Sequence, residues 1–97
     1  MLFHTTISPK AGVTHEDAKK SLEMWLRWKQ PEGFEIKSFW LAPDGRGFLI
    51  VEAETAESAY EATGPWVNVN LDYDIVPIIE IEKAVPLMEK AIAFREA

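Results

Sequence analysis

Residues 34–54, FEIKSFWLAPDGRGFLIVEAE, contain two apolar-rich runs separated by a turn. Pro43–Arg46 forms the turn, because Gly45 can adopt the positive φ that a tight connection between strands needs. The runs Phe34–Ala42 and Gly47–Glu54 alternate in character, which is typical of strands whose side chains point to opposite faces of a sheet. The segment therefore predicts a β-hairpin.

The two faces of the predicted sheet differ in composition. A further strand, Leu2–Ser8, alternates in the same way. One set of side chains is apolar and indicates a face covered by helices; it consists of Phe3, Ile7, Phe39, Leu41, Leu49, Val51 and Ala53. The opposite set mixes polar and aromatic side chains; it consists of His4, Thr6, Ser8, Ser38, Trp40, Phe48, Ile50 and Glu52. This mixed face is typical of a cavity wall or of an interface between two copies of a chain.

Helices are predicted between the strands. Thr14 is an N-cap candidate for a helix that runs to about Lys29. Its spacing predicts a buried stripe made of Ala18, Leu22, Trp25 and Leu26. Thr55 is the N-cap candidate of a shorter helix, which ends at Gly64-Pro65.

The C-terminal part predicts a strand and a helix. The run Leu71–Ile81 is apolar and branched, and Pro77 within it indicates an edge strand or a bulge. A third helix is expected from about Lys83 to Glu96, and Pro86 fits it only within the first turn, where its missing N–H costs nothing.

The predicted order is β-α-β-β-α-β-α over one domain, residues 1–97. Two right-handed crossovers around a hairpin give a four-stranded antiparallel sheet with helices on one face, an α+β fold of the ferredoxin-like kind. We expect the other face to hold Trp40, Phe48, Ile50 and Tyr73 or its neighbours. That apolar area is too large to leave in water, so either the third helix or a second copy covers it. We expect the second copy, and hence a homodimer.

The amino-acid composition excludes several classes of binding partner. The net charge of −6 is spread along the chain without a Lys/Arg cluster, so no nucleic acid partner is expected. The absence of cysteine excludes disulfides and thiolate chemistry. No apolar segment approaches the length of a membrane span, so we expect no membrane partner and a soluble cytoplasmic protein.

Several motifs resemble a bacterial family that is catalogued as a domain of unknown function. They are the start MLFH at residues 1–4, WKQPEG at 28–33, DGRG at 44–47 with the strand after it, and Pro65-Trp66. By fold that family resembles the dimeric α+β barrels, which include muconolactone isomerase-like proteins, antibiotic-biosynthesis monooxygenases and haem-degrading monooxygenases. The resemblance implies two sheets that face each other in a dimer, and a ligand between a protomer's sheet and its helices.

The chain departs from the haem-degrading members of that group. They use an Asn on the first strand with a Trp and a His further on, whereas here His4 is on the first strand, Trp66 follows the second helix, and no His follows His15. We therefore expect no cofactor. His4 and His15 also lack the spacing of metal ligands, and no metal site is expected.

Five residues are candidates for a site. His4 is the candidate catalytic acid or base, since imidazole titrates near neutral pH; the alternative is a structural histidine that bonds across the sheet or the dimer interface. Trp40, Glu52, Trp66 and Tyr73 are candidate ligand-binding residues. Flat aromatic walls favour an apolar or aromatic ligand, but packing in a core explains the tryptophans equally well, and Glu52 fits a solvated carboxylate.

Two functions fit these observations. The first is a small-molecule site in a homodimer, with a cofactor-independent isomerase or monooxygenase as its catalytic form. The second is a non-catalytic dimeric interaction or regulatory module. A cavity beside His4 would favour the first.

Overall fold

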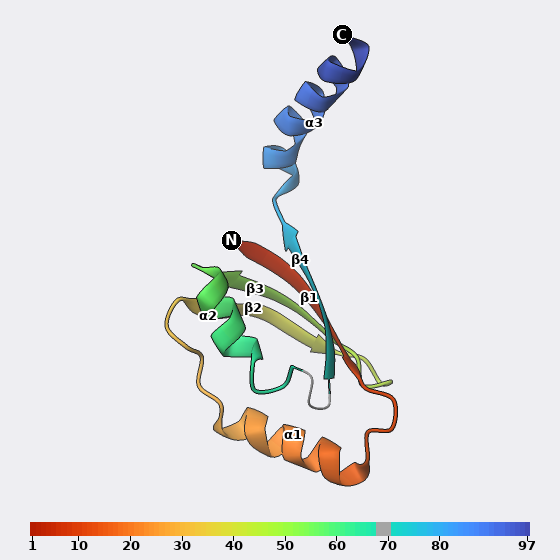
Figure 1. The fold of residues 1–97 in the computed structure, drawn as a ribbon, viewed down its shortest axis with the longest axis vertical. Helices are drawn as coiled ribbons and strands as arrows, with labels where there is room; N and C mark the ends of the chain where they lie inside the picture. The colour runs from red at the N-terminus through yellow and green to blue at the C-terminus, as the bar shows by residue number, and fades with distance from the viewer. Residues whose placement is uncertain (68–70) are drawn as a thin grey trace.

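The computed structural model describes residues 1–67 and 71–97 (Figure 1). Along the chain come β1 (Leu2–Pro9), α1 (His15–Arg27), β2 (Phe34–Leu41), β3 (Gly47–Ala53), α2 (Ala56–Thr63), β4 (Leu71–Ile78) and α3 (Ile81–Glu96). The strands form one antiparallel sheet in the order β2-β3-β1-β4, and α1 and α2 lie on one side of it. The predicted α+β ferredoxin-like fold is confirmed.

Strand pairing confirms the two predicted faces of the sheet. His4 pairs with Ile50 of β3, and its neighbour Thr5 pairs with Leu49. Paired residues share a face, so the apolar set lies under the helices and the mixed set lies on the other side. We call this second side the open face; it comprises Leu2, His4, Thr6, Ser8, Glu35, Ser38, Trp40, Phe48, Ile50, Glu52, Asp72, Asp74, Val76 and Ile78.

The hairpin also follows its prediction, with one irregularity. Gly45 has a φ of 91°, the left-handed conformation expected at this turn. A register shift in β2 falls between Ile36 and Ser38. Because a bulge inserts one residue, side chains before it change face, and Phe34 joins Ile36 and Phe39 on the helix side.

Helix α1 corrects the predicted buried stripe. It begins after a capping box of Thr14 and Asp17 and ends at Arg27, two residues before the predicted Lys29. None of its residues is buried, and Leu26 is 74% exposed. The reason is that α1 stands away from the sheet, whereas α2 packs on β2 and β3. The apolar stripe of α1 borders a hollow, and Trp25 is the member that reaches the sheet, through its ring contact with Phe39 of β2.

The C-terminal part resolves one alternative that the sequence left open, Tyr73 or its neighbours on the mixed face, and brings two corrections. Tyr73 pairs with Ile7 and therefore faces the helices, while its neighbours Asp72 and Asp74 face the open side. Strand β4 ends at Ile78, and α3 starts at Ile81, which is earlier than predicted. Pro86 consequently lies in the second turn of α3, where one backbone hydrogen bond is lost. Because α3 is exposed on all sides, water can solvate the carbonyl that this leaves free.

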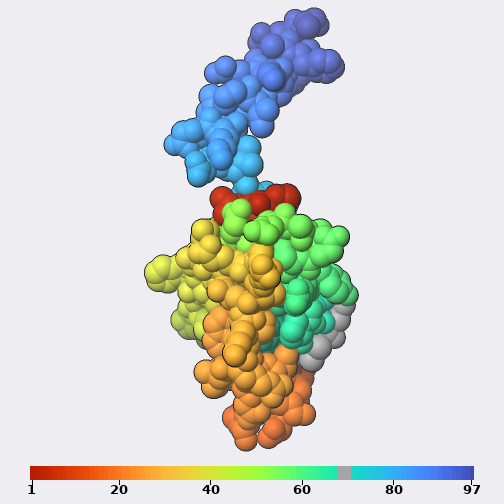
Figure 2. Space-filling model, turned by 90° about the vertical axis from the view of Figure 1, so that its left-hand side faces the viewer, coloured from red at the N-terminus to blue at the C-terminus, as the bar shows by residue number. Residues whose placement is uncertain are grey.

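Helix α3 extends away from the rest of the chain (Figure 2). Among the described elements, it lies against no other helix or strand. The molecule is 58 Å long, and its radius of gyration is 16.9 Å, compared with about 13 Å for a compact chain of this length. No helix in the described ranges has the length and apolar character needed to cross a bilayer.

Candidate functional site

A cavity lies between the helices and the sheet. Its volume is about 670 Å³, within the range of small-molecule sites. Residues of the sheet form its floor, while residues of α1 and α2 together with Trp28 and Trp66 form its roof. The lining residues are Phe3, Thr5, Ile7, Pro9, Val13, Ala18, Ser21, Leu22, Trp25, Trp28, Phe34, Ile36, Phe39, Leu41, Gly45, Leu49, Val51, Ala59, Ala62, Thr63, Trp66, Leu71, Tyr73 and Ile75.

Aromatic rings occupy the part of the cavity above β2. Trp25 of α1 stacks on Trp28 with ring centroids 5.6 Å apart, and it meets Phe39 edge-on at 5.4 Å. Trp66, which is buried, lies 5.9 Å from Trp28, and Phe34 also meets Trp28 edge-on. We call these five residues the aromatic cluster. Offset and edge-on pairs are favourable arrangements of aromatic rings, so the cluster connects α1 to the sheet across the hollow.

The cavity has few polar groups. The lining includes no Lys, Arg, His, Asp or Glu within the described ranges, and hydroxyls come from Thr5, Ser21, Thr63 and Tyr73. Burial raises the pKa of Tyr73 to about 12, so its phenol stays protonated at neutral pH and can donate a hydrogen bond. This lining suits an uncharged molecule, and none of its described side chains would act as a general acid or base near neutral pH.

The sheet separates the five predicted site residues. Trp66 and Tyr73 line the cavity, whereas His4, Trp40 and Glu52 lie on the open face. The mixed face was predicted to be a cavity wall or an interface, and the cavity instead borders the apolar face. Of the open-face candidates, Trp40 is 72% exposed.

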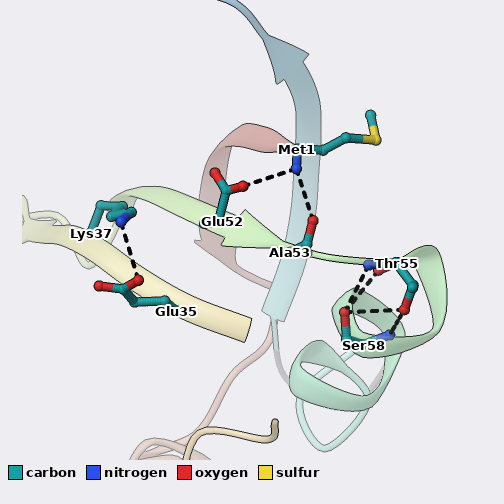
Figure 3. A network of polar contacts seen from close by, with 7 residues as sticks. All are labelled: Met1, Glu35, Lys37, Glu52, Ala53, Thr55 and Ser58. Carbon is teal, nitrogen blue, oxygen red and sulfur yellow. Dashed lines mark hydrogen bonds and ion pairs between the residues drawn. The ribbon is translucent and has the colours of Figure 1, made fainter. Parts of the chain in front are cut away.

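Glu52 takes part in a polar contact at one end of the sheet (Figure 3). Its Oε1 accepts a hydrogen bond of 3.0 Å from the amino group of Met1, which also donates to the carbonyl oxygen of Ala53 at 2.9 Å. Nearby, Thr55 and Ser58 form the capping box that starts α2. The side chain of Met1 is 67% exposed and that of Glu52 is 41% exposed, so this ion pair contributes little to stability.

Only Trp66 and Tyr73 of the described lining were predicted as ligand-binding residues, and Trp25, Trp28 and Thr5 are the most informative of the others. Trp25 and Trp28 were attributed to core packing, because aromatic residues at helical spacing are usually core. Thr5 had no distinguishing signal beyond a polar side chain at an apolar position of a strand. That pattern is the one available clue in the sequence, since both of its neighbours on that face of β1, Phe3 and Ile7, are apolar.

A second apolar surface lies on α3. Its residues Ile81, Ala84, Val85, Met88, Ala91 and Ile92 follow helical spacing and lie along one side of the helix; we call them the α3 stripe. The large members are between 42% and 64% exposed.

No three His, Cys, Asp or Glu side chains within residues 1–67 and 71–97 are grouped closely enough to hold a metal ion.

Comparison with known proteins agrees with the expected likeness. A family model described as "Domain of unknown function (DUF3303)" matches residues 1–92. No curated protein and no solved structure matches the chain.

Proposed function

The chain belongs to the DUF3303 family, a domain of unknown function, and from its geometry we propose that it binds a small apolar or aromatic molecule in the cavity between its helices and its sheet. The observation that supports this most is the 670 Å³ volume bordered by the aromatic cluster, without a charged side chain in the described lining. The cavity separates α1 from the sheet, and no residue of α1 is buried in this chain of 97 residues. Such a gap reduces stability, so an occupant that fills it would be favoured.

We further propose that the binding form is a homodimer of the α+β barrel type. The open face of four strands measures roughly 500 Å², from a strand spacing of about 4.8 Å and a rise of about 3.3 Å per residue. The α3 stripe adds roughly 240 Å², from a rise of about 1.5 Å per residue and a helix width of about 10 Å. The total is close to the ~800 Å² that each partner buries in a standard interface. A second copy would cover both surfaces.

An isomerase or monooxygenase reaction that uses His4 would require a substrate site outside the cavity. His4 lies on the open face, so an acid or base role for it needs a substrate held between the two sheets of the dimer. We therefore propose ligand binding as the function of the cavity itself. A non-catalytic interaction module is the second candidate, and the exposed α3 stripe favours it.

Filling the cavity tests the proposal. The probe is N-phenyl-1-naphthylamine, an uncharged dye with a phenyl and a naphthyl group. Its fluorescence rises in apolar surroundings. Ser21 lines the cavity from α1, so Ser21→Trp should occupy part of the volume and weaken dye binding at least about tenfold. Lys20→Trp is the matched control, because Lys20 is the adjacent residue, exposed and outside the lining.

The titration has two outcomes that would reject the proposal. One is wild-type protein that gives no saturable fluorescence increase at any dye concentration tested. The other is a Ser21→Trp variant that binds the dye as tightly as Lys20→Trp, which would place the dye outside the cavity. Circular dichroism of both variants checks that they remain folded.

A further inference from the structure

One polar group in the cavity floor is buried without a partner. Thr5 is on β1, one of the two central strands, and only 4% of its surface is exposed. Thr5 lines the cavity, and its hydroxyl forms no hydrogen bond with any residue that the structure describes. Thr63 provides the contrast, because its hydroxyl donates to the carbonyl oxygen of Ala59 at 3.0 Å. Buried hydroxyls almost always have partners, so Thr5 needs an explanation.

Tyr73 provides a second hydroxyl on the same side of the cavity. Thr5 pairs with Ile75 of β4, and Tyr73 is two residues from Ile75 on the same face. Diagonal neighbours across antiparallel strands are about 7–8 Å apart, within reach of an aromatic side chain. The phenol of Tyr73 has no hydrogen-bond partner in the described part of the chain either. The two hydroxyls can therefore act on one group of a ligand.

These hydroxyls lie at a defined distance from the aromatic cluster. Phe39, Leu49 and Thr5 form one row of paired residues that runs across β2, β3 and β1. Adjacent strands are about 4.8 Å apart, so Thr5 is about 10 Å from Phe39 along this row. Trp25 covers Phe39 from α1. The cavity thus has an aromatic end above β2 and a hydroxyl end above β1 and β4.

The charge of the lining limits the ligand further. No side chain with a formal charge lines the described cavity, and the residues between its two ends are apolar. A carboxylate or an ammonium group placed there would lose its hydration without gaining a counter-ion, which is strongly unfavourable. A neutral oxygen would instead satisfy Thr5 and Tyr73.

We propose that the cavity selects uncharged molecules with a flat ring system and one hydrogen-bonding oxygen, whose rings contact the aromatic cluster and whose oxygen bonds Thr5 and Tyr73. This proposal rests on the proposed binding function and narrows its ligand class. A phenol or a ring ketone of two fused rings has the required length. Thr5 and Tyr73 act as specificity-determining residues, since each can accept from or donate to that oxygen.

Three matched probes test the selection: 2-naphthol, naphthalene and 2-naphthoate, each measured by equilibrium dialysis at pH 7. They share the two fused rings and differ in having a neutral oxygen, no oxygen or a negative charge. We expect 2-naphthol to bind about threefold to tenfold more tightly than naphthalene, as one buried hydrogen bond provides. We expect 2-naphthoate to bind at least about a hundredfold more weakly than 2-naphthol.

Variants of Thr5 and Tyr73 test whether these residues cause the preference for 2-naphthol over naphthalene. Thr5→Val keeps the shape of the side chain and removes its hydroxyl, so it should reduce the 2-naphthol preference and leave naphthalene affinity unchanged. Tyr73→Phe should act in the same way and serves as an independent variant. The matched control is Thr6→Val, on the same strand but on the open face, which should preserve the preference.

The outcomes separate this proposal from the proposed function. Binding of naphthalene and 2-naphthoate as tight as that of 2-naphthol would overturn the selection while leaving the cavity a binding site. A 2-naphthol preference that persists in both Thr5→Val and Tyr73→Phe would overturn the assignment to these hydroxyls. Failure of all three probes to bind, together with failure of the fluorescent dye, would reject the binding function itself.

Discussion

At the scale of single residues, Thr5 combines a polar side chain with a buried position on an apolar face. It lies in the middle of the sheet between Phe3 and Ile7, where the floor of the cavity is otherwise apolar. Burying a hydroxyl without a partner costs about 1–3 kcal/mol in proteins. Valine would have the same shape without that cost. A threonine at this position is therefore better explained by a bound group than by the stability of the empty fold.

Tyr73 gives a pH-dependent prediction for the same site. Burial raises its pKa to about 12 from an ordinary value of 10.0. Its contribution to stability is therefore fully present below pH 10. It is lost as the pH rises toward 12, because the unfolded chain then binds fewer protons than the folded one. We expect the free energy of unfolding, measured with urea, to fall between pH 10 and pH 12. This fall should be smaller in Tyr73→Phe, and an identical fall in both proteins would contradict burial of the phenol.

Among the elements, the sheet shows how far the sequence predicts the site. Alternation placed Thr6 and Trp40 on one face and Phe39 on the other, because side chains in a strand have a period of two. It could not place Phe34, since the bulge before Ser38 changes the phase of β2. It also could not orient Tyr73, because β4 has large apolar side chains on both faces.

Helix α1 marks the other limit of sequence-based prediction. The spacing of Leu22 and Trp25 correctly indicates which side of the helix faces the sheet. Spacing contains no information about the distance between the helix and the sheet, which depends on how the side chains of both elements pack. Helical spacing alone therefore could not predict the cavity, although the family resemblance implied a ligand at this place, and the candidate ligand-binding residues Trp66 and Tyr73 are in its lining.

The sheet also separates the cavity from the open face. His4 lies on the open face, and the cavity lies on the other side of the strands. We expect His4→Ala to leave the dissociation constant of N-phenyl-1-naphthylamine within about twofold of wild type. Trp25→Ala, which removes a ring from the cavity, should weaken dye binding about threefold to tenfold. Trp25 is partly exposed and lies on a helix without buried residues, so this variant should fold.

The comparison of these two variants locates the ligand. A loss of affinity in His4→Ala as large as that in Trp25→Ala would place the dye on the open face. That result would move the binding site to the space between two sheets and would support the acid or base role for His4.

At the scale of the whole molecule, large apolar side chains are exposed on both the open face and α3. Trp40 on the open face and Ile81, Met88 and Ile92 on α3 are all at least 46% exposed. Largest apolar patches on monomers are usually partner sites. The molecule is 58 Å long because α3 extends from β4 without packing on the sheet. A second copy that covers both surfaces would explain the composition and the shape together.

Helix α3 allows a matched test of this assembly. Ile92 belongs to the α3 stripe, and Ala93 lies about 100° further around the helix, away from the stripe. In a symmetric dimer both copies lose the contact, so Ile92→Lys should raise the dimer dissociation constant at least about a hundredfold. Ala93→Lys adds the same charge and should change it less than about threefold. Sedimentation equilibrium measures both constants. If wild-type protein is monomeric at all concentrations, the homodimer is wrong; if the two variants dimerise equally well, α3 lies outside the interface and a different partner must cover its stripe.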